Sequence, residues 1–295
     1  MLATHAMTRT DWTCKLLAVD LDGTLLNRVH EVSPPDRAAL HRAHEAGLKV
    51  VLCTGRALAE TRPVLDRLGL DLDAVVTVGG AVVTDLATGR TLARREMPPE
   101  LARDVAQWFQ SQGYALLWLT DADAVGHDGF VLDGPRRHAQ LDRWLSMTPC
   151  RVRAVPRLPA DVPGAVRLTV VDEPEVLAEL TRRLEDDFAG KVAHNILTAP
   201  VYRLSLIEMF VAGVSKWAAI QLLCERWGID PGATAAVGDD VNDIDMIRNA
   251  GLGVAMENAL PAVRAVARRT TRSHNEAGVA EVVGWLLDGT AASGT

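Results

Sequence analysis

KLLAVDLDGTL, residues 15–25, joins an apolar run to two aspartates and a glycine. The run Lys15–Asp20 is continuously apolar after its first residue, which favours a strand buried on both faces, as in a parallel sheet. Asp20 and Asp22 stand at the end of this strand, and Gly23 lets the backbone turn sharply there. The stretch therefore predicts an α/β protein with its chemistry at the carboxyl ends of the strands.

Strands and helices alternate around this stretch. Ser33 and Pro34 have the residue types of a helix N-cap and first helical position. Apolar runs and helical spacing predict a helix ending near Gly47, a strand at 49–53, a helix at 58–68 and a strand at 74–78. The pattern returns with a helix at 215–227, a strand at 234–237, a helix from about 241 to 249, a strand at 252–255 and two further helices. Such alternation predicts a Rossmann-like parallel-sheet core.

The middle of the chain has a different sequence pattern. Strand-like runs occur at 114–119, 166–171 and 191–196, helical spacing surrounds Trp108 and Leu177, and prolines between 149 and 163 indicate an irregular connection. We expect residues 86–210 to form an inserted α/β domain, and residues 12–85 and 211–288 to form the core. Residues 1–11 are expected to be a disordered leader and 289–295 a frayed tail.

Composition limits the partners. A formal net charge of -7 gives no reason to expect nucleic acid or an anionic membrane. No apolar run approaches a membrane span, and residues 1–11 lack the apolar segment of a secretory signal. Four cysteines without C-x-x-C spacing favour free buried thiols in a reducing cytoplasm. Because the net charge is negative, any phosphate site must be made positive locally, by a metal, a lysine or backbone N–H groups.

Two polar clusters lie in the first third of the chain. In Asp20-Leu21-Asp22, one carboxylate could attack phosphorus while the other handles a proton at the leaving oxygen. A helix-capping turn with a solvated aspartate pair is the alternative. In Thr54-Gly55-Arg56, a hydroxyl and a backbone N–H at a helix start could bind an anion. For that triplet alone, a plain N-cap is the better interpretation.

Two further clusters lie in the last third. Lys216 opens a helix, where the macrodipole disfavours a cation, so it needs an anion nearby; most surface lysines have no such role. The run Asp239-Asp240-Val241-Asn242-Asp243 follows a strand and supplies oxygen ligands suited to Mg²⁺. An acidic loop capping the next helix is the alternative, which repulsion among close carboxylates makes less favourable without a cation.

In this order the clusters resemble the motifs of the haloacid dehalogenase superfamily of phosphohydrolases, and most closely its Cof-type branch. The strings that carry the resemblance are AVDLDGTL at 18–25, GVSK at 213–216, GDDVND at 238–243 and GLGVAMENA at 251–259. The resemblance covers nearly the whole chain after residue 11. The combination of motifs is highly specific for the type of reaction, but it says little about which substrate is used.

The resemblance implies a haloacid dehalogenase fold whose inserted domain is a C2-type cap. It implies that Asp20 is the nucleophile and Asp22 the general acid/base. It assigns the following roles: phosphate binding to Thr54, Gly55, Lys216 and Asn242; Mg²⁺ binding to Asp20, the Asp22 carbonyl and Asp239; support of the metal or of Lys216 to Asp243. The implied activity is Mg²⁺-dependent hydrolysis of a small phosphomonoester, a sugar phosphate by default, with a flavin precursor also open. A cytoplasmic monomer or homodimer is expected.

Two residues depart from the branch pattern. Gly79 stands where an asparagine is usual, which removes a polar contact, and Trp217 stands where a small residue is usual. We expect Trp217 to fill core space. Alternatives to the phosphatase are a phosphomutase or phosphotransferase using the same aspartate, and a non-catalytic sensor of a phosphorylated ligand. A nucleotide-binding oxidoreductase would need G-x-G-x-x-G after the first strand, where the chain reads Asp-Gly-Thr.

Overall fold

The computed structural model describes residues 12–199 and 204–292. The expected leader at 1–11 and the last three residues of the expected tail lie outside the described residues. Contacts divide the chain into two compact units. The first comprises Met1–Thr54, Val64–Val75 and Lys216–Thr295, and the second Gly55–Pro63 and Val76–Ser215.

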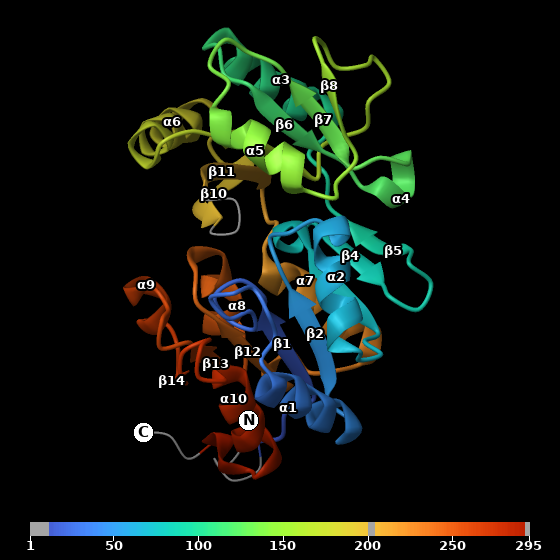
Figure 1. Ribbon diagram of the computed structural model, residues 1–295, viewed down its shortest axis with the longest axis vertical. Coiled ribbons are helices and arrows are strands. Elements are labelled where there is room, and N and C mark those ends of the chain that lie inside the picture. Colours follow the sequence, from blue (N-terminus) through green and yellow to red (C-terminus); the bar gives the residue numbers. More distant parts are fainter. Residues whose placement is uncertain (1–11, 200–203, 293–295) are drawn as a thin grey trace, which may run out of the picture. The chain divides into compact units, whose positions relative to one another are not determined.

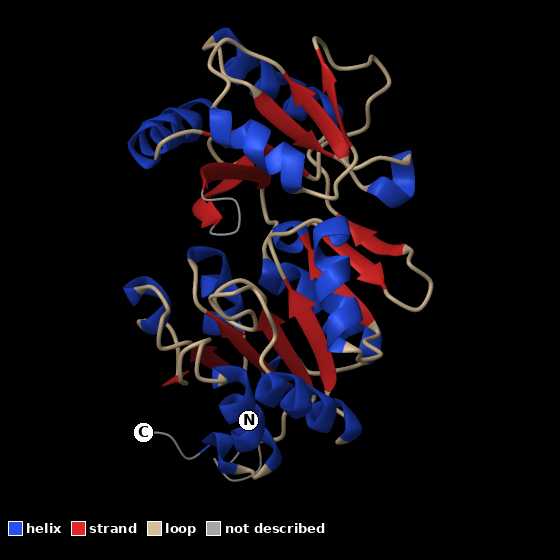
Figure 2. Ribbon diagram, viewed as in Figure 1, coloured by secondary structure: helices blue, strands red, loops and turns tan. Residues whose placement is uncertain are grey.

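Parallel strands form the sheet of the first unit, as the sequence predicts (Figures 1 and 2). They are β1 (Leu16–Asp20), β2 (Lys49–Cys53), β12 (Thr234–Gly238), β13 (Leu252–Ala255) and β14 (Arg269–Thr270). Strand β1 pairs with β12 on one side and β2 on the other. All five residues of β1 are buried, which explains its continuous apolar run.

The helices of the first unit begin where local sequence directs them. Helix α1 (Pro34–Glu45) has Ser33 as its N-cap, as predicted, and the Ser33 side chain accepts from the Asp36 N–H. Helix α1 lies against α10 (Gly278–Leu287) in Figure 1, and the Asp36 carboxylate accepts from the Ala280 N–H of α10 at 2.8 Å. The others are α7 (Lys216–Trp227), α8 (Ile244–Asn249), α9 (Pro261–Arg264) and the 3₁₀ turns η2 (Pro231–Ala233), η3 (Val241–Asp243) and η4 (Thr290–Ala292).

The second unit contains a six-stranded sheet in the order β10-β11-β9-β6-β7-β8. Figure 2 draws its strands in red. Its strands are β6 (Leu116–Leu119), β7 (Gly129–Leu132), β8 (Val152–Val155), β9 (Arg167–Val171), β10 (Val192–Ala199) and β11 (Leu204–Val211). Helices α3 (Pro99–Ser111) and α6 (Pro174–Asp187) pack on one face, in a core that includes Phe109 and Trp118. Helix α5 (Ala139–Met147) packs on the other face, and α4 (Ala122–Val125) is a short turn.

The remaining elements lie between residues 58 and 94. They are α2 (Leu58–Leu68), β3 (Ala74–Thr77), the 3₁₀ turn η1 (Val78–Gly80), β4 (Val82–Asp85) and β5 (Thr91–Arg94). Strands β4 and β5 form an antiparallel hairpin.

One sequence-based expectation needs correction, and another is confirmed. The proline-rich stretch from 149 to 163 is not wholly irregular, because β8 lies within it and pairs in parallel with β7. Trp217 is half-buried, and its filling of core space stays a prediction. The expected free, buried state of all four cysteines, which lie within the described residues, is confirmed. None of the described helices has the length and apolar character needed to cross a membrane.

Candidate active site

The carboxyl ends of three neighbouring strands bring together Asp20, Thr54 and Asp239. Asp20 is the last residue of β1, and its register partner on β2 is Cys53, so Thr54 comes one residue beyond it. On the other side, Val19 pairs with Val237, and β12 ends at Gly238 just before Asp239. Parallel pairing thus gathers residues distant in sequence at one sheet edge.

Lys216 forms hydrogen bonds with two carboxylates near the carboxyl ends of these strands. It is the first residue of α7 and is fully buried. Its Nζ donates to Asp20 Oδ1 at 2.5 Å and to Asp243 Oδ1 at 2.6 Å. The expectation that a lysine at a helix start needs a nearby anion is therefore confirmed, since two carboxylates offset both the dipole and the burial.

Asp239 is held by the loop that follows β1. The Thr24 hydroxyl donates to Asp239 Oδ1 at 2.7 Å. Gly23 has a φ of 81°, and a Cβ there would lie 2.2 Å from Asp239 Oδ2. The Asn258 side chain donates to the Gly23 carbonyl at 2.8 Å and fixes that turn. Only glycine leaves room for this carboxylate.

Sequence reasoning missed Thr24 and Asn258 as functional residues. Both lie inside the motif strings that carry the family resemblance, so the signal was present. Their hydrogen bonds span 215 and 235 residues of chain, which no local pattern could pair.

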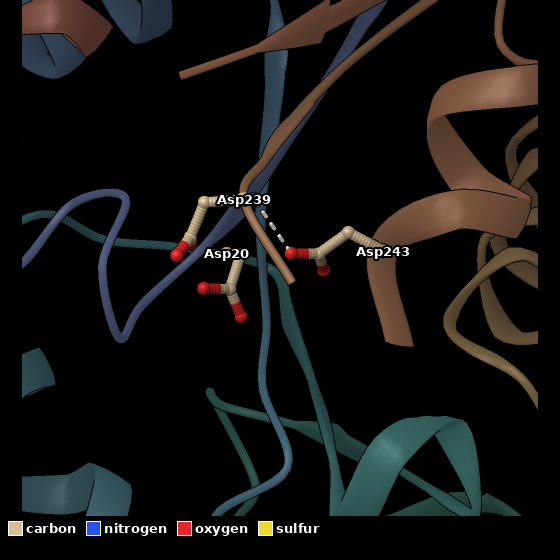
Figure 3. Close-up of side chains that lie close together, drawn as sticks. All are labelled: Asp20, Asp239 and Asp243. Atoms are coloured by element: carbon tan, nitrogen blue, oxygen red, sulfur yellow. Dashed lines mark hydrogen bonds between the residues drawn. The ribbon is translucent and has the colours of Figure 1, made fainter. Parts of the chain in front are cut away.

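Asp243 supports its neighbours with both carboxylate oxygens. While Oδ1 accepts from Lys216, Oδ2 accepts from the N–H groups of Asp239 at 2.9 Å and Asp240 at 3.1 Å. Figure 3 shows the first of these amide bonds as a dashed line. A Cβ on Gly238 would lie 2.4 Å from the Asp243 carboxyl carbon, so the close approach requires glycine. Asp243 therefore fits the supporting role that the family resemblance implies.

Asp20, Asp239 and Asp243 each offer an oxygen within 4.8 Å of the others (Figure 3). Burial raises the pKa of Asp20 well above its ordinary value; Lys216 opposes this, while Asp243 and Asp239 add to it. Burial and then Asp243 raise the pKa of Asp239 to about 7. Burial alone would lower the pKa of Lys216, but Asp20 and Asp243 outweigh it and raise that pKa.

The charges and ligand atoms of this cluster fit a divalent cation. Three ionised carboxylates and one ammonium leave two negative charges in a buried space, and a cation there would lower the cost of ionising Asp20 and Asp239. The ligand atoms are all oxygens, as Mg²⁺ prefers. Since Asp243 is occupied by Lys216 and two amides, Asp20 and Asp239 are the better placed carboxylate ligands.

For three other predicted site residues the structure gives the burial and the local backbone. Thr54 is 1% exposed, and Asp22 is half-buried and forms a β-bridge with Leu26. Asn242 is half-buried in η3. Gly55 belongs to the second unit, so its position relative to Asp20 stays a prediction.

The departure at Gly79 has a steric reason. Gly79 has a φ of 65°, in the left-handed region, and a Cβ there would lie 3.0 Å from Phe210 Cζ. Asparagine tolerates this backbone region better than most residues, but its Cβ would press on the Phe210 ring. Phe210 is 2% exposed and packed in a core cluster, so it has little freedom to move.

Comparison with known proteins shows the family of the chain. The family model for haloacid dehalogenase-like hydrolases matches residues 17–283. Phosphatase YwpJ of Bacillus subtilis is 31% identical, over 92% of this chain and 100% of that protein. The 5-amino-6-(5-phospho-D-ribitylamino)uracil phosphatase YwtE of the same organism is 28% identical, over 93% of this chain and 99% of that protein. A solved haloacid dehalogenase-like hydrolase from B. subtilis has a TM-score of 0.76 at 27% identity, covering 92% of this chain and 99% of that one.

The chain belongs to the haloacid dehalogenase-like hydrolases. Within that superfamily it is a Cof-type phosphohydrolase, a phosphoric monoester hydrolase. The predicted haloacid dehalogenase fold and the enzyme class are confirmed by these relatives, and the C2 type of the cap stays a prediction.

Proposed function

We propose that this protein hydrolyses a small phosphomonoester in a Mg²⁺-dependent reaction that passes through an aspartyl-phosphate intermediate on Asp20. The observation that carries the proposal is the Lys216 bridge, which joins Asp20 to Asp243 beside Asp239. A buried carboxylate beside a fixed ammonium suits attack on a phosphate dianion, because the ammonium offsets the repulsion between the two anions.

The residues divide the work as follows. Asp20 attacks phosphorus through one carboxylate oxygen, and Lys216 holds that carboxylate and the transferring group. Asp22, two residues further along, donates a proton to the leaving oxygen and then accepts one from the water that hydrolyses the aspartyl phosphate on Asp20. Thr54, Gly55 and Asn242 bind phosphoryl oxygens.

The metal would be held by Asp20, the carbonyl of Asp22 and Asp239. When bound, Mg²⁺ supplies positive charge that neutralises phosphoryl oxygens and the crowded carboxylates. Thr24 and the Gly23 turn keep Asp239 in place for this purpose, and Asp243 keeps Lys216 in place.

The substrate is a small phosphorylated metabolite, of which sugar phosphates are the default. The relative YwtE is a phosphatase of a phosphorylated ribitylamino compound, which supports a polyol phosphate as one candidate. A panel of phosphorylated metabolites assayed for phosphate release with Mg²⁺ would rank them by kcat/KM. Release of phosphate to water, and not to an added sugar hydroxyl, distinguishes hydrolysis from phosphotransfer.

Asp20→Asn tests the mechanism. The amide cannot form the aspartyl phosphate, so we expect turnover of p-nitrophenyl phosphate to fall by a factor of about 10³ or more while the fold is kept. Phosphate release that persists in this variant, or that ignores removal of divalent cations by EDTA, would overturn the proposal.

A further inference from the structure

The second unit contains a buried ion pair between two neighbouring strands. Arg167 of β9 and Glu208 of β11 form it, with side chains 6% and 4% exposed. Glu208 is the register partner of Thr169, so Arg167, two residues earlier, lies on the same face of the sheet. A buried ion pair loses its hydration and is often no more stabilising than apolar residues of similar volume. Stability alone therefore does not account for this pair.

Arg167 has a second partner, and that partner belongs to the predicted phosphate-binding turn. Its Nη1 donates to the carbonyl of Gly55 at 2.7 Å as well as to the Glu208 carboxylate. Gly55 is bonded directly to Thr54, the last residue of that segment of the first unit. The ion pair thus holds the backbone one residue beyond a predicted phosphate ligand.

The next residues of the turn are held in the second unit as well. The Arg56 carbonyl accepts from the Val78 N–H at 2.9 Å. The Ala57 N–H donates to Glu60 Oε2 at 3.0 Å. Glu60 Oε1 in turn accepts from the side chains of Trp144 at 3.1 Å and Thr148 at 3.0 Å. Residues 55, 56 and 57 therefore each have a backbone group with a partner inside the second unit.

The hydrogen bond from Arg167 to the Gly55 carbonyl determines the orientation of the peptide between Gly55 and Arg56. The described residues contain no cis peptide bond. In a trans peptide the C=O and the following N–H point in opposite directions. Because Arg167 holds the Gly55 carbonyl, the N–H of Arg56 is turned away from Arg167.

We propose that Arg167, neutralised by Glu208, is a positioning residue for the turn at 54–56. It fixes the backbone N–H groups that meet the phosphoryl oxygens of the substrate. This inference rests on the proposed function, because it takes that turn as part of the phosphate site. It adds a buried pair from the inserted domain to the machinery of phosphate binding.

The chemistry of the guanidinium suits this task. One Nη carries two hydrogens in a fixed plane, so it can donate to Glu208 and to the Gly55 carbonyl together. Arg167 Nε is buried without a partner among the described residues. The guanidinium is therefore placed by its two Nη1 contacts, at the cost of one unsatisfied donor.

The main test is the double variant Arg167→Met/Glu208→Gln, which removes the Gly55 contact and leaves neither buried charge unpaired. We expect its KM for p-nitrophenyl phosphate and its Ki for inorganic phosphate to rise about tenfold or more, since small displacements of binding groups are costly. Because the Ki reports binding alone, it separates positioning from chemistry. Thermal unfolding of the same sample checks that the protein is folded.

Two further variants sharpen the test. Arg167→Lys keeps the charge beside Glu208 but lacks the fixed fork, so its KM and Ki should lie between those of the parent and the double variant. Asp128→Asn is the matched control: Asp128 is a buried acid of the second unit, 6% exposed, that contacts Arg151. We expect this control to keep the parent KM and Ki.

A folded double variant with the parent KM and Ki would overturn the positioning role. If the double variant does not fold, Arg167→Lys decides, and an unchanged KM and Ki in that variant would overturn the role equally. Failure of the proposed function has a different signature: the parent protein itself would release no phosphate from any ester. Binding of inorganic phosphate, measured by calorimetry, would then still report on Arg167.

Discussion

The Nζ of Lys216 lies 2.5 Å from Oδ1 of Asp20, although 196 residues separate them in the chain. The same ammonium lies 2.6 Å from Asp243 Oδ1. One buried cation therefore holds the proposed nucleophile against a carboxylate that also caps the backbone after β12. The charges of Asp20, Lys216 and Asp243 therefore depend on one another, and the pKa of Asp20 and that of Lys216 are each shifted by the other two residues.

Lys216→Met removes the positive charge and leaves Asp20 and Asp243 facing each other in a buried space. We expect the free energy of unfolding to fall by about 3–5 kcal/mol, as when one partner of a buried pair is deleted. Activity should fall at the same time. Urea unfolding and p-nitrophenyl phosphate turnover measure both effects.

The matched control for this change is Lys49→Met. Lys49 pairs with Asp73 at 2.7 Å, but both side chains are more than a third exposed. Such a pair contributes about 0–1 kcal/mol. Equal destabilisation by the two substitutions would contradict the role assigned to Lys216.

Thr24→Val keeps the shape of the side chain and removes the hydroxyl that donates to Asp239 Oδ1. Groups that hold a metal ligand in place typically matter by about 10–100-fold in metal affinity. We therefore expect the Mg²⁺ concentration for half-maximal activity to rise within that range. Activity measured over a Mg²⁺ titration provides the number.

Thr271→Val controls for the loss of a buried hydroxyl. Thr271 is 3% exposed, and its hydroxyl donates to the Gly278 carbonyl at 2.7 Å. Both variants should lose some stability, but only Thr24→Val should alter the Mg²⁺ requirement. An unchanged requirement in Thr24→Val would remove Thr24 from the proposed metal site.

Asp36 should make stability depend on pH. Burial raises the pKa of its carboxyl above the ordinary value, against hydrogen bonds from Ser33 and α10. The folded state thus takes up a proton at a higher pH than the unfolded state does. Its contribution to the free energy of unfolding is therefore least favourable above the folded-state pKa, and it becomes more favourable as the pH falls through that pKa.

Asp36→Asn removes this titration while an amide can still bond both partners. The stability of the parent relative to the variant should increase as the pH is lowered from about 7 to about 4. Urea unfolding at several pH values measures the difference. A constant difference, or one that shrinks on acidification, would contradict the assignment.

The four cysteines should be unreactive in the native protein. All are buried, and burial raises the pKa of Cys14 and Cys150 to about 12 and that of Cys224 to about 11. The reactive thiolate is therefore scarce near about pH 8. A thiol reagent such as DTNB should label the protein only as fast as it unfolds, and fully in urea. Rapid labelling of the native protein would show that a thiol is accessible.

Local signals in the sequence determined many elements of the fold. The bounds of β2, α2 and β13 were predicted to the residue, because each element is defined by its own apolar run or helical spacing and by adjacent turn residues. The Ser33 cap and the lysine that needed an anion were predictable for the same reason. Strand β8 was not predicted, because its residues are exposed or only partly buried and give no continuous apolar run like that of β13. Strand β7, which pairs with β8, was not predicted either.

The sequence by itself determined the fold class and the residue types at the strand ends, because these depend on local patterns and on motifs. Only the tertiary structure decided which groups meet. It brought three pairs of residues within hydrogen-bond distance: Thr24 and Asp239, Lys216 and Asp243, and Arg167 and Gly55. Partners of this kind lie on different elements and are brought within hydrogen-bond distance by sheet register and packing, which no local run of residues encodes.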